Sequence, residues 1–228
     1  MLAVALAGCQ QRPTRLVEES IAARGGEARL RAIQSLRLAG KVAFGARTGT
    51  LRVEFKRPNR MRMEVALPEG TLLRLYDGSQ GWTSNAAGVF PVLQPMSEGE
   101  LSRARREADM DGPLLDSAAK GIRVALAGTA TALGKPADAL DVTFPDGTVQ
   151  RYYLDASTHQ PLGWDERRAV DGKPVVEETR FRTSRRVEGV LFPEAIDSAV
   201  EGSGQTNHIT LESIELNPPL PDGRFHPG

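Results

Sequence analysis

The sequence has few cysteines and aromatic residues, and no excess of charge of either sign. Cys9 is the only cysteine among 228 residues, so no disulfide can form within the chain. The three histidines lie far apart without a cysteine partner, which gives no basis for a structural zinc site. Lys plus Arg and Asp plus Glu each number 29, so the basic excess typical of nucleic-acid-binding proteins is missing. We therefore predict no metal, no other cofactor and no nucleic-acid partner.

The sequence signatures of common enzyme classes are also missing. No Gly-x-Ser-x-Gly elbow, no Walker-type loop and no Gly-x-Gly-x-x-Gly after a predicted strand occurs. The adjacent carboxylates Glu177 and Glu178 point to opposite faces of a predicted strand, unlike the paired acids of a glycosidase. No run of 18 apolar residues is present for a membrane-spanning helix. We predict no catalytic residues and a protein that is not an enzyme.

The first nine residues are small and apolar up to Cys9, and the chain then becomes polar. Leu6-Ala7-Gly8-Cys9 resembles the lipobox that ends a bacterial lipoprotein signal peptide. The apolar stretch is eight residues long and no basic residue precedes it, so we expect the signal to run further upstream. The resemblance implies that the thiol of Cys9 accepts a diacylglyceryl group, with palmitate among the fatty acids of the lipidated cysteine. The alternative is an apolar N-terminus with an incidental cysteine.

These features predict three segments. Residues 1–9 form the remnant of a lipoprotein signal ending at Cys9, residues 10–14 form a short tether, and residues 15–228 form a single domain. No linker separates regions of different composition, and no repeat is evident.

The secondary structure expected along the domain begins with helix and continues with strands. Residues 14–35 predict two short helices, with Thr14 as the N-cap and a break at Gly25-Gly26. From Ser35 the apolar residues alternate with charged ones, which is typical of antiparallel strands solvated on one face. The expected strands lie near residues 35–44, 51–55, 61–67, 73–76, 81–84 and 89–93.

The rest of the chain predicts one helix and a second series of strands. Ser97 and Glu100 match a capping box, which predicts a helix to about Met110. Strands are expected near residues 122–126, 140–144, 149–153, 162–164, 175–183, 195–201 and 207–216, with a hairpin turn at Pro145-Asp146-Gly147. This order of elements predicts an α+β fold, in which helices pack on one large antiparallel sheet.

The candidate binding residues are apolar side chains at alternating positions of three expected strands. They should share one face of the sheet and line a ligand cavity there. They are Leu51, Val53, Phe55, Met61, Met63, Val65, Leu73 and Leu75. Periodicity does not distinguish an apolar ligand cavity from a core that is filled by side chains.

Several segments, in order, resemble the LolA/LolB-like superfamily of envelope lipoprotein carriers. The resemblance is found in Gly25-Gly26 to Leu38-Ala39-Gly40, the hairpin from Phe55 to Arg62, Tyr76-Asp77-Gly78-Ser79-Gln80-Gly81-Trp82, Tyr153-Leu154-Asp155 with Pro161-Leu162, Gly189 to Pro193, and Ile214 to Asn217 with Phe225-His226-Pro227. It implies a strongly bent antiparallel sheet, an incomplete β-barrel, with helices packed on or plugging the concave face. It also implies that the concave face can hold acyl chains.

The resulting hypothesis is an envelope lipoprotein that binds or transfers an acylated ligand, either a lipid or a lipoprotein. The alternative is a structural or assembly lipoprotein with the same fold and a filled core. The membrane would be a partner through the lipid at Cys9, and the chain is expected to be a monomer. Gln10, rather than Asp, follows Cys9, and the resemblance to sorted lipoproteins implies the outer membrane, facing the periplasm.

Overall fold

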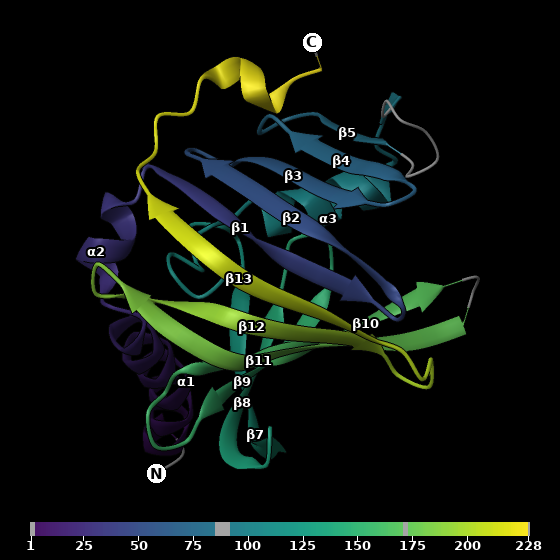
Figure 1. Ribbon diagram of the computed structural model, residues 1–228. Helices are drawn as coiled ribbons and strands as arrows, with labels where there is room; N and C mark the ends of the chain where they lie inside the picture. Colours follow the sequence, from purple (N-terminus) through teal and green to yellow (C-terminus); the bar gives the residue numbers. More distant parts are fainter. Residues whose placement is uncertain (1–2, 85–91, 171–172, 228) are drawn as a thin grey trace. The chain divides into compact units, whose positions relative to one another are not determined.

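The computed structural model describes residues 3–84, 92–170 and 173–227, and their side chains except those of residues 3–11, 168–170, 173 and 174. The chain divides into two compact units. Unit 1 comprises Met1–Leu30 and Pro113–Thr206, and unit 2 comprises Arg31–Gly112 and Asn207–Gly228. Figure 1 labels most of the helices and strands.

Unit 2 is an antiparallel sheet with one helix packed on it. Its strands are hydrogen-bonded in the order β6-β5-β4-β3-β2-β1-β13. Their bounds are Ser35–Phe44 (β1), Arg47–Lys56 (β2), Arg60–Leu67 (β3), Gly70–Tyr76 (β4), Gly81–Ser84 (β5), Leu93–Pro95 (β6) and Thr206–Leu216 (β13). The helix α3 (Glu98–Glu107) follows β6, and the 3₁₀ helix η1 (Asp222–Phe225) lies in the C-terminal tail.

Unit 1 is a second run of antiparallel strands, in the order β12-β11-β10-β9-β8-β7. Their bounds are Arg123–Ala132 (β7), Lys135–Thr143 (β8), Val149–Asp155 (β9), Pro161–Val170 (β10), Lys173–Val187 (β11) and Val190–Val200 (β12). The long helix α1 (Ala3–Ala23) packs on this sheet, placing Leu16 and Val17 in a core with Leu140, Val142 and Leu154. Helix α2 (Glu27–Ala32) follows α1 after the break at Gly25-Gly26.

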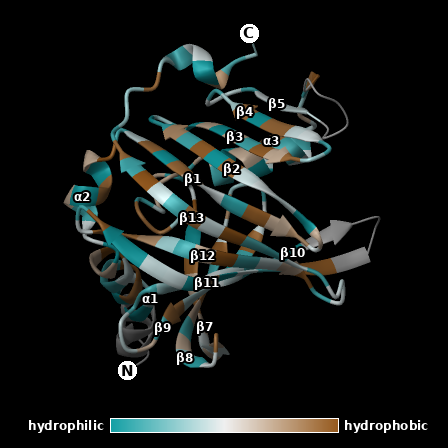
Figure 2. Ribbon diagram, in the orientation of Figure 1, coloured by the Kyte–Doolittle hydropathy of each residue, from teal (hydrophilic) through white to brown (hydrophobic). Residues whose placement is uncertain are grey.

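The alternation of residues along the strands determines which face each side chain joins. Successive side chains of a strand point to opposite faces, so apolar and charged residues separate onto the two faces. Figure 2 shows this alternation of hydrophobic and hydrophilic residues along the strands of unit 2. The burial in β2 follows it, since Leu51 and Val53 are buried whereas Arg52 between them is exposed.

One glycine in each unit permits a bulge that bends the sheet. The pairing of β1 with β13 shifts register between Ala39 and Gly40, and a Cβ at Gly40 would lie 2.0 Å from the carbonyl oxygen of Thr210. Gly163 in β10 has a φ of +135°, and a Cβ there would lie 2.0 Å from the carbonyl oxygen of Thr179. A bulge turns a strand and increases its twist, and both bulges require the close backbone approach that only glycine allows.

The structure confirms the predicted α+β class, with antiparallel strands that do not close into a barrel and helices on their apolar faces. The strands of both series are confirmed, apart from the one expected at residues 89–93. Residues 89–91 lie outside the described residues, and β6 begins at Leu93. The helix after the Ser97 capping box is confirmed with both reciprocal hydrogen bonds.

The predicted start of the first helix at Thr14 is wrong, because α1 runs unbroken from Ala3 through Pro13 to Ala23. Helix-forming residues flank Pro13, with Gln10, Gln11 and Arg12 before it and Arg15 and Leu16 after it, and the packing of Leu16 and Val17 against the unit 1 sheet stabilises the helix. Residues 10–14 are thus helical, and their role as a tether stays a prediction, as does the single-domain boundary at 15–228. None of the helices in the described part of the chain is long and apolar enough to cross a membrane.

Candidate ligand-binding face

The apolar face of unit 2 is formed by cross-strand neighbours from β2 and β3. Leu51 lies opposite Val65, Val53 opposite Met63, and Phe55 opposite Met61. On β1, Leu38 continues the same row next to Val53. Leu72, Ile209, Leu211 and Ile214 extend this apolar face onto β4 and β13.

Six of the eight predicted residues lie together on this face. Leu51, Val53, Met61 and Val65 are less than a tenth exposed, whereas Phe55 and Met63 are only partly buried. The structure therefore brings the predicted β2 and β3 residues into one apolar surface.

Leu73 and Leu75 do not lie on the apolar face, which corrects the prediction for β4. The register of β3 with β4 pairs Met61 with Tyr76 and Val65 with Leu72, so Leu72 and Tyr76 share the apolar face. Leu75 instead lies opposite Arg62, on the other side of the sheet, where it is 1% exposed. The stretch from Leu72 to Tyr76 has apolar residues in both phases, so alternation alone could not choose between them.

Helix α3 covers part of the apolar face through small side chains. Ala104 and its C-cap Ala108 are 0% and 2% exposed, and both belong to the same core as Val53 and Met61. Leu101 and Met96 pack against this core from the same segment. Because alanine has a short side chain, the helix can approach the sheet closely at Ala104 and Ala108.

Polar contacts hold α3 in place above the sheet. Arg74, which shares the phase of Leu72 and Tyr76, donates to Glu107 at 2.7 Å, and Arg103 donates to the same carboxylate at 2.7 Å. At the N-terminus of the helix, Glu100 accepts hydrogen bonds from the backbone and side chain of Ser97, which lower its pKa. The capping box thus stabilises the start of α3, and Arg74 ties its C-terminal end to β4.

The segment after α3 has a stronger attachment. Both terminal nitrogens of Arg57 donate to the two oxygens of Asp111 at 2.7 Å, and Nε donates to the carbonyl of Ile33 at 2.7 Å. The hydrogen bonds to Asp111 raise the pKa of Arg57, outweighing its desolvation. This bidentate pair fixes the chain directly after the helix.

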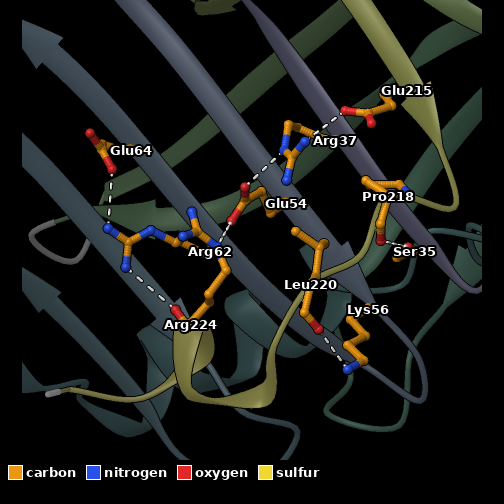
Figure 3. A network of polar contacts seen from close by, with 10 residues as sticks. All are labelled: Ser35, Arg37, Glu54, Lys56, Arg62, Glu64, Glu215, Pro218, Leu220 and Arg224. Atoms are coloured by element: carbon orange, nitrogen blue, oxygen red, sulfur yellow. Dashed lines mark hydrogen bonds and ion pairs between the residues drawn. The ribbon is translucent and has the colours of Figure 1, made fainter.

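The opposite face of unit 2 is covered by the C-terminal tail. Figure 3 shows the contacts, in which Glu54 accepts hydrogen bonds from Arg37 and Arg224, and Lys56 donates to the carbonyl of Leu220. Asp222 accepts from Lys56 and pairs with Arg60, and the hydrogen bonds from these two cations lower its pKa to about 2. Each carboxylate named here has two cationic partners, so ion pairs and the tail occupy this part of the face.

Unit 1 carries a hollow of about 510 Å³ on the face away from α1. Asp141 and Arg151 form a bidentate pair within it. Asp165 pairs with Arg180 at 2.7 Å and accepts a hydrogen bond from the hydroxyl of Tyr153. Burial and the hydrogen bond to Asp165 raise the pKa of Tyr153 to about 12, so the phenol stays protonated. These charges are paired with one another, and the hollow by itself specifies no ligand.

The other face of the unit 1 sheet carries an aromatic row that the sequence analysis did not single out. Trp164 stacks on Tyr152 with ring centroids 5.4 Å apart and meets Phe181 edge-on at 5.4 Å. Trp164 and Phe181 are only partly buried. The sequence places these three aromatic residues on three expected strands. That they form a row follows only from the register in which β9, β10 and β11 pair.

Comparisons with known proteins show the fold. No protein-family profile and no curated protein matches the chain. Among solved structures, it is similar to a DUF1329 family protein from Desulfovibrio piger (TM-score 0.63, 13% identity, 94% of this chain and 97% of that one). It is similar to a LolA superfamily protein from Nitrosomonas europaea (TM-score 0.63, 15% identity, 94% and 97%). A putative outer membrane lipoprotein-sorting protein domain from Vibrio parahaemolyticus gives a TM-score of 0.61 at 11% identity, covering 94% and 96%.

The protein therefore has the LolA/LolB-like fold, as the sequence resemblance predicted. At these identities the likeness shows the fold and nothing about the ligand. The side chain of Cys9 lies outside the described part of the structure, so the lipid anchor stays a prediction.

Proposed function

We propose that this protein binds the acyl chain of a lipid or lipoprotein in the bacterial envelope, between α3 and the apolar face of unit 2. It acts by binding and release and performs no covalent chemistry. The carrier role is supported by the fold, which it shares with a protein described as a lipoprotein-sorting domain. We further propose that the lipid at Cys9 anchors it to the outer membrane, with the domain in the periplasm.

The apolar face and its thin cover are the observation that carries this proposal. The face presents aliphatic, Met and Phe side chains and is rich in partly buried residues, including Phe55, Met63 and Leu72. Burial of an acyl chain contributes about 0.8 kcal/mol per CH₂ and needs no directional partner, so a surface of this kind binds chains of many lengths. The cover is a ten-residue helix whose only buried residue is Ala104, with Leu101 and the C-cap Ala108 packing on the same core.

The competing function is a structural or assembly lipoprotein whose core is filled. The burial of Leu51, Val53, Met61 and Val65, each below a tenth exposed, favours it. The two functions differ in what added bulk does to the protein. A chain-binding space accepts a larger side chain and loses ligand, whereas a close-packed core is destabilised by about 1–3 kcal/mol.

Val65→Trp tests this difference, with Thr50→Trp as the matched control. Thr50 is an exposed residue of β2, in the opposite phase to Leu51, so its side chain adds the same bulk to the other face. We expect Val65→Trp to lower binding of a fluorescent fatty acid with little change in the unfolding midpoint, and Thr50→Trp to change neither. A lower midpoint in Val65→Trp, together with no probe binding by the wild type, would establish the filled core instead.

Native mass spectrometry of protein extracted from membranes gives an independent measurement. A lipid that co-purifies with the wild type and is depleted in Val65→Trp supports the carrier. Wild-type protein that repeatedly carries no lipid would contradict it.

A further inference from the structure

The two edge strands of the sheets differ in how well they are protected against pairing. In unit 2 the strand order ends at β6, which has three described residues and ends in Pro95. In unit 1 it ends at β7, which has ten residues and no proline. Over the described residues, the backbone of β7 has hydrogen bonds only in its ladder with β8. Its outer edge thus presents a row of free N–H and C=O groups.

The composition of β7 lacks the usual protection of an edge. Arg123 at its start is its only charged residue, and the rest are Val, Ala, Leu, Gly and Thr. A bulge between Leu126 and Gly128 interrupts the first half of the strand. Beyond the bulge, Gly128–Ala132 pairs regularly with β8, and Thr129 and Thr131 are exposed. This five-residue segment combines a free backbone edge with small, uncharged side chains.

We propose that Gly128–Ala132 pairs antiparallel with the same segment of a second copy, about a two-fold axis at Ala130. This register places Thr129 opposite Thr131 of the partner subunit, and the symmetry produces the same pair twice. Cross-strand threonine pairs are favourable, and no charge lies within either segment to oppose their approach. Arg123 falls outside the paired residues.

The residues of the two edge strands favour a closed dimer, in which β7 pairs with β7, over a filament, in which β7 pairs with β6 of the next copy. Joining β7 of one molecule to β6 of the next would produce a filament, but β6 is short and the nitrogen of Pro95 has no proton to donate. Pairing of β7 with itself is isologous and closes after two copies. An uncharged edge also carries no charge pattern that would select a foreign segment.

Sedimentation equilibrium of the full chain tests the pairing, in a Cys9→Ser background that prevents a disulfide at that position. We expect a monomer–dimer equilibrium at submillimolar concentrations, because the paired segment is short. Replacing Thr129 and Thr131 with Lys places like charges opposite each other and should weaken dimerisation at least tenfold. Thr50→Lys changes an exposed threonine on a strand paired on both sides, and should leave dimerisation unchanged. A wild-type chain that stays monomeric, as the sequence analysis expected, would overturn the proposal.

Cross-linking tests the register independently of affinity. In the same background, Ala130→Cys places two thiols directly across the two-fold axis, at a separation that a disulfide can span. We expect oxidation to give covalent dimers of Ala130→Cys and few of Ala125→Cys, since Ala125 lies on the far side of the bulge. Equal cross-linking of the two variants would show that the copies do not pair in this register.

Discussion

Glu54 and Arg224 are 170 positions apart in the sequence, yet Nε of Arg224 donates a hydrogen bond to Oε2 of Glu54 at 2.6 Å. The other carboxylate oxygen accepts from Arg37 at 3.0 Å, and the side chain of Glu54 is only 1% exposed. A buried carboxylate needs such partners, because an uncompensated charge in the interior is strongly unfavourable. The C-terminal tail thus supplies one of the two arginines that pair with Glu54 of β2 (Figure 3).

Replacing Glu54 with Gln should destabilise the protein while preserving the side-chain volume. The variant leaves Arg37 and Arg224 without their shared carboxylate, and we expect a loss of about 2 kcal/mol, in the range of charged hydrogen bonds. Glu64→Gln is the control, because Glu64 is 39% exposed and forms a more exposed ion pair with Arg62. Denaturant unfolding compares the two, and equal losses would show that the buried position of Glu54 adds nothing.

The same carboxylate should make stability fall in acid. Burial opposes ionisation of Glu54, but the hydrogen bonds from Arg224 and Arg37 outweigh it, so the pKa is lowered. A carboxyl with a lowered folded pKa stabilises the protein above its unfolded pKa of about 4.3, and this stabilisation is lost as the pH falls through the folded pKa. The Tm of the wild type should therefore drop more steeply below about pH 4 than that of Glu54→Gln. Parallel Tm curves would argue against this role.

Two glycine-to-alanine substitutions should have opposite effects. Gly40→Ala would place a Cβ 2.0 Å from the carbonyl oxygen of Thr210, so the bulge must deform, and we expect a loss of more than about 2 kcal/mol. Gly99→Ala in α3 meets no atom within 4 Å and should stabilise the helix by up to about 1 kcal/mol. Thermal unfolding measures both. A neutral Gly40→Ala would mean that the bulge is not needed for the fold.

The ion pair between Arg74 and Glu107 should control access to the apolar face. These side chains are 20% and 32% exposed, so losing their pair should reduce stability by no more than about 1 kcal/mol. If the ligand enters beneath α3, Arg74→Ala should accelerate uptake of a fluorescent fatty acid several-fold and increase amide exchange in α3. Arg47→Ala removes a surface pair with Glu69 and should leave both measurements unchanged. Slower or unchanged uptake in Arg74→Ala would place the entrance elsewhere.

Cys9→Ser should abolish lipidation of the full-length precursor, because Cys9 is the only thiol in the sequence. Metabolic labelling with a fatty-acid probe compares the variant with the wild type. We expect the label to be lost and the protein to leave the membrane fraction. Retention of the label by Cys9→Ser would disprove attachment at this position.

The sequence by itself determined the features that depend on neighbours along the chain. Alternation identified the strands, Ser97 and Glu100 identified the start of α3, and Pro145-Asp146-Gly147 identified a hairpin turn. These signals are local, because a cap or a turn needs only residues a few positions apart. They were sufficient for the α+β class and for placing six of the eight predicted residues on the apolar face.

Only the tertiary structure decided the features that depend on register and distant pairing. The phase of β4 assigned Leu72 rather than Leu73 to the apolar face, and a shift of one residue exchanges the two faces of a strand. The partner of Glu54 came from the other end of the chain, and the continuation of α1 through Pro13 contradicted the local signal at Thr14. In each case the decisive energy lies in contacts between segments that the sequence separates, and no local pattern encodes which segments will meet.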